Sequence, residues 1–300
     1  MNAISEQINL FNQNYRELTA RFDHEYGVLW AHMNPAPIPC FSSGILADMR
    51  DYQAIIQSSG GVIATRGRIR TIDYFVLASK VAGVFNLGGD LRLFRDLIIR
   101  GERDKLFQYA KACIDVLYAN IINYDLPITT ISLVQGDALG GGFEAALSSD
   151  IIIAEKSAQM GLPEVLFNLF PGMGAYSLIG RRIGTKRAED FILSGRIYTA
   201  EELHEIGLVD IVAEDGYGEM ALYEYIKKQN RRRNTMNALA QVRRRCNAVS
   251  YEELIDVTKI WVDAAFRLED RDLRMMERLV RAQRKLAVET TEAEVEQVAA

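Results

Sequence analysis

Residues 136–144 have the sequence GDALGGGFE, and they follow a run rich in β-branched residues, 128–134. The run predicts a buried strand, and residues 141–148 predict a short helix after the glycines. Three consecutive glycines let the backbone approach a neighbouring group closely, because no Cβ stands in the way. The free N–H groups of the first helical turn favour negative charge there. Such a turn can bind an oxyanion or a phosphate, or serve only as a tight connection.

A second glycine turn lies upstream, where residues 84–90 have the sequence VFNLGGD. It ends a predicted strand and precedes a predicted helix over residues 91–124, with a break near Gly101. Asp90 is placed to cap this helix, with contact to a substrate as the alternative role. The chain therefore has two glycine turns that each join a strand to a helix and expose backbone N–H groups.

Two glutamates accompany these turns. Glu144 lies in the short helix after the first turn, and Glu164 ends the sequence GLPE, residues 161–164, which has no helical periodicity. Each turn can supply one N–H donor to an oxyanion, and the two carboxyl groups can exchange protons in the same space. Taken alone, Glu144 would more often be a solvated helix residue.

The chain divides into three parts by its sequence patterns. Residues 1–25 are polar and predict a helical arm. Residues 26–215 alternate strands with helices, which predicts an α/β architecture with parallel crossovers. Residues 216–300 predict long amphipathic helices rich in Arg, Glu, Leu and Ala. Strands are predicted at 27–33, 74–78, 128–134, 150–154 and 208–212, and Ser43 is placed to cap the helix that follows the prolines at positions 35, 37 and 39.

The composition is that of an ordinary globular protein, with 49% hydrophobic residues, 25% charged residues and a net charge of -5. This mild acidity disfavours bulk binding to nucleic acid or anionic lipid. The N-terminal sequence has no signal pattern, and no apolar run approaches the roughly 18 residues needed to span a bilayer. We therefore expect a cytoplasmic protein without a membrane span. Isolated cysteines and scattered histidines predict neither a disulfide framework nor a metal site.

The sequence DALGGGFE, followed by SSDIIIAEKSAQMGLPEVLFNLFPGMGA, resembles the crotonase, or enoyl-CoA hydratase/isomerase, superfamily. The GGDL turn at residues 88–91 resembles the earlier oxyanion-hole turn of that superfamily, and the similarity covers roughly residues 70–215. The resemblance implies a spiral of ββα units. It also implies that the C-terminal helical region is used in oligomerisation, as a homotrimer or a dimer of trimers.

The same resemblance implies roles for four residues. The amides of Gly89 and Gly141 would hold the thioester oxygen in an oxyanion hole. Glu144 and Glu164 would be the paired acid and base of the hydratase branch. Many superfamily members lack one of these glutamates, so the presence of both favours addition or removal of water over isomerisation or dehalogenation.

Within the superfamily, the chain looks most like the diffusible-signal-factor synthases. The likeness rests on YFVLASKVAGVFNLGGDLRLF at residues 74–94, on PAPIPCFSSGIL at residues 35–46, and on the arm before the first strand. These synthases convert a 3-hydroxyacyl chain on acyl carrier protein to a cis-2-enoyl chain. They also cleave thioesters, releasing free fatty acids that include the cis-2-unsaturated quorum-sensing signal.

The resemblance therefore implies a dehydratase and thioesterase with acyl carrier protein as partner, a signalling protein as a possible regulator, and no cofactor beyond the acyl carrier or coenzyme A. An enoyl-CoA hydratase of fatty acid metabolism is the enzyme alternative. A non-catalytic crotonase-fold binding module is the other alternative, and the intact glutamates and glycine turns count against it.

A set of apolar residues and two arginine runs each have two interpretations. Met173, Trp261 and Leu279 either pack in the core or at an oligomer contact, or line an apolar pocket for an acyl chain. The arginine runs 231–233 and 243–245 either lie on solvated helix faces or bind an acidic carrier protein or coenzyme A phosphates. RNA binding is disfavoured, because the chain is acidic and has no RNA-binding motif.

Overall fold

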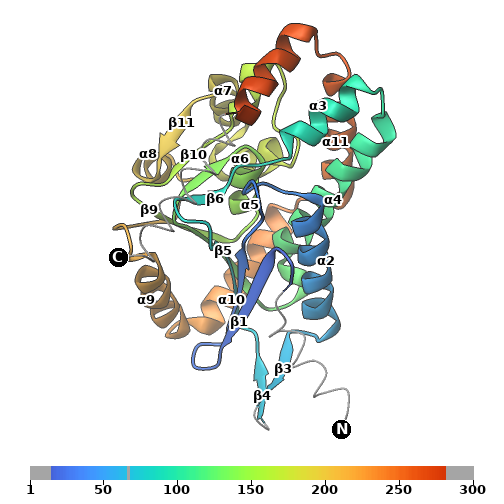
Figure 1. The fold of residues 1–300 in the computed structure, drawn as a ribbon. Coiled ribbons are helices and arrows are strands. Elements are labelled where there is room, and N and C mark those ends of the chain that lie inside the picture. The colour runs from blue at the N-terminus through green and yellow to red at the C-terminus, as the bar shows by residue number, and fades with distance from the viewer. Residues whose placement is uncertain (1–14, 66–67, 282–300) are drawn as a thin grey trace, which may run out of the picture.

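The computed structural model describes residues 15–65 and 68–281. In this part of the chain, strands form a six-stranded sheet of order β1-β2-β5-β7-β9-β12, a four-stranded sheet of order β11-β10-β8-β6 and a β3-β4 hairpin, with helices packed around them (Figure 1). The strands are β1 Leu18–Asp23, β2 Val28–Met33, β3 Val62–Thr65, β4 Arg68–Thr71, β5 Tyr74–Ser79, β6 Val84–Asn86, β7 Thr129–Val134, β8 Asp137–Leu139, β9 Ile151–Glu155, β10 Gln159–Gly161, β11 Ile197–Thr199 and β12 Ile211–Ala213.

The helices surround the sheets and continue beyond them toward the C-terminus. They are α2 Ser43–Ser58, α3 Leu91–Ile99, α4 Arg103–Ile121, α5 Gly141–Leu147, α6 Ala175–Ile183, α7 Thr185–Ser194, α8 Ala200–Glu205, α9 Gly218–Asn230, α10 Arg233–Cys246 and α11 Tyr251–Ala265, with the 3-10 helices η1 Asn123–Asp125 and η2 Pro163–Phe167. Residues 270–281 form a further helical segment.

Three consecutive strand pairs build a spiral. β5, β7 and β9 are neighbours in the six-stranded sheet, while β6, β8 and β10, which follow them along the chain, are neighbours in the four-stranded sheet. A helix or pair of helices follows each pair. β6, β8 and β10 run parallel to one another, so their carboxyl ends lie at one edge of the small sheet. The predicted α/β spiral of ββα units is confirmed, and it brings three chain segments to the same edge.

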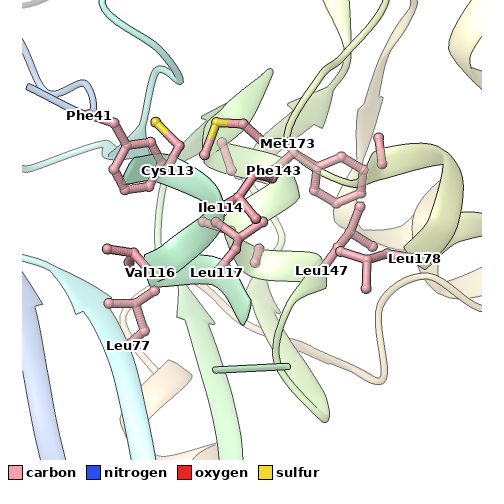
Figure 2. Close-up of a cluster of buried hydrophobic side chains, with 14 of the residues drawn as sticks. Phe41, Leu77, Cys113, Ile114, Val116, Leu117, Phe143, Leu147, Met173 and Leu178 are labelled. Carbon is pink, nitrogen blue, oxygen red and sulfur yellow. The ribbon is translucent and has the colours of Figure 1, made fainter. Parts of the chain in front are cut away.

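Helix α4 packs against α2, α3 and α11 and contributes a buried apolar face to the main core. Figure 2 shows its residue Ile114 among the buried side chains of this core, which include Leu77 of β5 and Leu147 of α5. At the end of α4, the buried Asn120 amide donates a hydrogen bond of 2.8 Å to the Ser148 hydroxyl, directly after α5. Buried polar groups cost free energy unless they are paired, so this bond favours one position of α5.

The N-terminal arm differs from its prediction. Residues 18–23 form strand β1 rather than a helix, pairing antiparallel with β2 so that Leu18 lies opposite Met33. The segment LTARFD alternates apolar and polar residues, which is the period of a strand with one covered face. The overall polarity of the arm hid this alternation. Residues 1–14 lie outside the described residues, so the predicted helix is not tested there.

Several element boundaries also need correction. Ser42, not Ser43, caps α2, because Ser42 has an extended backbone and its hydroxyl accepts from the amides of Gly44 and Ile45. The last predicted strand, 208–212, is β12 at residues 211–213. The break near Gly101 and the capping of α3 by Asp90 are both confirmed.

The four-stranded sheet was predicted only in part. Strands β8, β10 and β11 each have three residues, and none of them is among the predicted strands. Short strands of this kind owe their conformation to pairing with their neighbours rather than to residue propensity. Their absence from the sequence-based prediction therefore has a physical reason.

Residues 218–281 are mainly helical as predicted, from α9 to the segment 270–281, whereas the predicted helices over residues 282–300 lie outside the described residues. The use of this region in forming trimers stays a prediction. Within residues 15–65 and 68–281, none of the helices combines the length and the apolar character required to cross a bilayer.

The glycine at position 142 provides a test of the fold. A Cβ at Gly142 would lie 2.0 Å from the Asn86 carbonyl oxygen, whereas a Cβ at Gly180, inside α6, would have its nearest neighbour outside the helix's own backbone, Thr185, at 3.6 Å. We expect Gly142→Ala to lower the free energy of unfolding by at least about 3 kcal/mol, because a backbone contact cannot move aside. Gly180→Ala should be neutral or stabilising by up to about 1 kcal/mol. Equal stabilities of the two variants in denaturant titrations would contradict this packing.

Candidate active site

The predicted site residues lie together at the edge of the small sheet. Gly89 follows β6, Gly141 follows β8, and Glu164 follows β10. Glu144 lies one turn into α5, which begins at Gly141. All four line one cavity of about 130 Å³. Segments far apart in the sequence thus meet because consecutive ββα units place their second strands side by side.

The two glycine turns touch each other. Gly88 has a φ of +90°, and a Cβ there would lie 2.7 Å from the Leu139 carbonyl oxygen. A Cβ at Gly141 would lie 3.4 Å from the Gly89 nitrogen. Within the described residues, the amide N–H groups of Gly89 and Gly141 have no hydrogen-bond acceptor. Two neighbouring N–H donors are therefore available to a ligand oxygen in the cavity.

A buried tyrosine holds the first of these turns in place. The Tyr109 hydroxyl donates to the carbonyl oxygen of Phe41 and accepts from the amide of Asp90 at 3.1 Å. The Phe41 amide in turn donates to the Gly88 carbonyl oxygen at 2.7 Å. Tyr109 was not identified from the sequence, because a tyrosine within a helical pattern gives no indication of a partner far away in the chain.

The Glu144 carboxylate is held by main-chain donors. Its Oε1 accepts from the amides of Met173 at 2.8 Å and Ala175 at 2.9 Å, and the residue is 1% exposed. Burial raises the pKa of Glu144 above its ordinary value, and the two amide bonds partly oppose this rise because they favour the charged form. These two amides were not predicted from the sequence, which indicated a role only for the side chain of Met173. The glycines on either side of Met173, Gly172 and Gly174, could have indicated a main-chain role.

Glu164 has a different environment. It is the second residue of η2, and a Cβ at Gly140 would lie 2.6 Å from its Oε1. Its Oε2 is buried and has no hydrogen-bond partner among the described residues. Burial and the charge of Glu144 raise the pKa of Glu164. Because Glu144 has two amide donors and Glu164 Oε2 has none, a single proton on the pair is favoured on Glu164.

The rest of the cavity wall is mainly apolar. The rings of Phe94 and Trp261 meet edge to face at 5.0 Å, and Trp261 packs so closely on Gly172 that a Cβ there would lie 2.4 Å from the indole. Met173, Trp261 and Leu279 all line the same cavity as the glutamates. Leu279 comes from the helical segment 270–281, so the end of the described chain contributes to the wall. Their role toward an acyl chain stays a prediction.

The arginine runs lie elsewhere, and half of their members are engaged within the protein. Arg233 pairs with Asp73, and Arg243 lies 3.3 Å from an Asp150 oxygen. Arg244 donates to a main-chain carbonyl oxygen. None of the six arginines lines the cavity. Among the described residues, there is also no group of three or more His, Cys, Asp or Glu side chains suited to a metal ion.

Comparison with known proteins places this site in a family. The family model for enoyl-CoA hydratase/isomerase matches residues 65–264, which is most of the chain. The chain belongs to the enoyl-CoA hydratase/isomerase family. The matched range includes both glutamates and both glycine turns.

Individual relatives agree with this family. Mouse mitochondrial methylglutaconyl-CoA hydratase is 34% identical over 158 residues, which are 52% of this chain and 46% of that protein. YngF of Bacillus subtilis is 35% identical over 179 residues, which are 58% of this chain and 62% of that protein. The chain thus spans about half the length of the mouse relative.

Solved structures agree with the fold. Enoyl-CoA hydratase of Geobacillus kaustophilus is 22% identical with a TM-score of 0.67, covering 86% of this chain and 91% of that one. DspI of Pseudomonas aeruginosa is 25% identical with a TM-score of 0.64, covering 78% of this chain and 83% of that one.

The buried Glu164 carboxyl makes stability depend on pH. Its pKa is higher in the folded state than in the unfolded chain, so the folded state loses stability as pH rises through the folded pKa. We expect Glu164→Gln to raise the free energy of unfolding by about 1–3 kcal/mol near pH 8.5 and to have little effect near pH 5. Denaturant titrations at the two pH values measure this difference.

The matched control is Glu224→Gln on the exposed face of α9. It should change the unfolding free energy by less than about 0.5 kcal/mol at both pH values. A Glu164→Gln effect of equal size at pH 5 and pH 8.5 would show that ionisation of this carboxyl does not cost stability.

Proposed function

We propose that this chain adds water to, or removes water from, the C2–C3 bond of an acyl thioester. One observation supports the proposal most strongly: two buried carboxyl groups without a cationic partner among the described residues share a cavity with two free backbone N–H donors. Buried, unpaired carboxyl groups are costly to the fold, and groups with raised pKa values gather at sites of proton transfer. The names of the relatives, which include a hydratase acting on a coenzyme A thioester, agree with this class of reaction.

The chemistry needs each of these parts. In dehydration, a base removes a proton from C2, an acid protonates the C3 hydroxyl, and the C3–O bond breaks as the C2–C3 double bond forms. The thioester oxygen gains negative charge during this step, and the amides of Gly89 and Gly141 would stabilise that charge. Loss of one such donor typically costs about 3–4 kcal/mol. A glutamate pair with one proton contains both the base and the acid, and in hydration the same groups act in the reverse direction.

The finer proposal concerns the substrate and product. We infer from the segments at residues 35–46 and 74–94 that the substrate is a 3-hydroxyacyl group on acyl carrier protein, and that the product is a cis-2-enoyl chain released as the free acid. Release would require a water molecule, activated by a glutamate, to attack the thioester carbonyl and break the C–S bond. The resulting tetrahedral oxyanion would use the same two amides, so one site can serve both steps.

An enoyl-CoA hydratase is the second candidate. It is favoured by the 34% identity to mouse methylglutaconyl-CoA hydratase over 158 residues. The products separate the two candidates by mass spectrometry and chromatography against synthetic standards. Free cis-2-enoic acid formed from a 3-hydroxyacyl carrier protein supports the finer proposal. Reversible hydration of trans-2-enoyl-CoA alone supports the second candidate, and the absence of turnover on both substrates overturns both.

The acid and base assignment has its own test. We expect Glu144→Gln and Glu164→Gln each to lower kcat/KM for enoyl formation by about 10²–10⁴-fold, because each removes one proton-transfer group. The wild type should show a bell-shaped profile of kcat/KM against pH, displaced above the usual carboxyl range, since both carboxyl pKa values are raised.

Glu155→Gln is the matched control, because Glu155 is also buried but is held by Gln135 and the Gly218 amide, outside the cavity. This variant should keep most of the activity. Near-wild-type dehydration by Glu144→Gln or by Glu164→Gln would contradict the shared acid and base assignment.

A further inference from the structure

The helical segment 270–281 has two very different faces. Its inner face includes Asp272 and Met276, which are buried, and Leu279, which lines the site cavity. Within residues 271–281, every exposed residue is an arginine, and the exposed Asp270 lies at the start of the segment. We call these arginines the arginine face. Its members are Arg271, Arg274, Arg278 and Arg281.

The segment is fixed in position over the site. The Asn168 amide, directly after η2, donates to Asp272 Oδ2 at 3.2 Å. On the other side, Arg95 of α3 lies 3.8 Å from Glu277. In Figure 1 the segment is drawn in red near α3, at the top of the molecule. The arginine face therefore lies on the outer side of an element whose inner side forms part of the cavity wall.

The charge on this face is only partly neutralised. Arg271 pairs with Glu269, and Arg281 pairs with Glu277. Arg274 and Arg278 form no ion pair with any described residue. The chain as a whole carries a net charge of -5, so this face has the opposite sign to the protein that carries it. Glu269 and Glu277 are engaged with Arg271 and Arg281, so the positive charge of Arg274 and Arg278 is left unpaired among the described residues.

We propose that the arginine face is the docking surface for an acidic acyl carrier protein whose thioester arm enters the cavity beside it. The inference rests on the proposed action on carrier-bound thioesters. An acidic partner would be repelled by the overall negative charge, so it needs a local basic surface, and the surface must lie near the cavity for the arm to reach the glutamates. Arg278 is adjacent in sequence to Leu279, and Arg92 is adjacent to Leu91, so exposed arginines flank two cavity-lining leucines.

Other occupants fit less well. A membrane surface is usually bound by a helix that also inserts an apolar face, but the apolar face of this segment is buried within the protein. Nucleic acid carries no thioester arm to enter the cavity beside the arginine face, so it would not account for the position of this face. The arginine runs on and before α10 are less suited to the carrier, because none of their members lines the cavity and three are engaged internally.

The test is the double variant Arg274→Glu/Arg278→Glu, assayed with one acyl group on two carriers. We expect KM for the acyl carrier protein thioester to rise at least about 10-fold, while kcat and KM for the same acyl group on N-acetylcysteamine, which has no acidic surface, stay unchanged. Wild-type KM for the carrier thioester should rise with salt, and this salt dependence should weaken in the variant. Arg274→Lys/Arg278→Lys should keep most of the affinity, because it keeps the charge.

The matched control is Arg231→Glu/Arg232→Glu, an exposed pair away from the cavity, which should leave the carrier KM unchanged. An unchanged carrier KM in Arg274→Glu/Arg278→Glu overturns the proposal. An equal rise of KM on both thioesters also overturns it. So does a loss of activity seen only with acyl-coenzyme A, or a loss of binding seen only with anionic phosphatidylserine vesicles.

Failure of the proposed function would be seen separately, as absence of wild-type turnover on both thioesters. Docking is then judged by direct titration of holo-acyl carrier protein against the full chain. Weaker binding by Arg274→Glu/Arg278→Glu than by wild type supports the arginine face as the docking surface, and equal binding overturns it.

Discussion

The contact between two glycine turns is the constraint on which the rest of the structure depends. At Gly88 a Cβ would meet the Leu139 carbonyl oxygen at 2.7 Å, and at Gly142 it would meet the Asn86 carbonyl oxygen at 2.0 Å. Only backbone without side chains can cross at this distance. The contact sets how closely β6 and β8 can end together, and therefore how closely two N–H donors can lie. The site is thus a consequence of main-chain packing more than of side-chain placement.

The electrostatics of the two glutamates, unlike the packing of the glycine turns, lowers the stability of the fold. Two carboxyl groups lie in the same cavity without a cation among the described residues, and the fold supports them unequally, with two amides for Glu144 and no partner for one oxygen of Glu164. This asymmetry costs stability, but it gives the two carboxyl groups different affinities for a proton. A salt bridge to either carboxylate would stabilise the protein and lower the pKa of that carboxyl. It would thereby remove the raised pKa on which the proposed proton transfer near neutral pH depends.

Sequence patterns predicted the residues that line this site better than the residues that hold them in place. The two glycine turns, Glu144 and Glu164 could be selected as candidates because glycine turns at strand ends and nearby carboxylates are local signals, and the resemblance to the superfamily then assigned the amides of Gly89 and Gly141. Tyr109 could not be selected, because its importance comes from a hydrogen bond to Phe41, 68 positions away. The same reason explains the strands: the longer β5, β7 and β9 have buried apolar runs, while β8, β10 and β11 exist through pairing alone. The strand β1 was missed although its alternation was present.

Residues inside and outside the range matched by the family model contribute to the site in different ways. Residues 65–264 contain the glycine turns, both glutamates and Trp261, so family membership accounts for the reaction centre. Phe41, which supports the Gly88 turn, lies before this range, and Leu279 and the arginine face lie after it. Contacts from outside the matched range therefore support one glycine turn, form part of the cavity wall and set the charge around it. Under the proposed function, the same proton transfers would serve many thioesters, so the choice among carriers and acyl chains would depend largely on residues such as these, which the family match does not include.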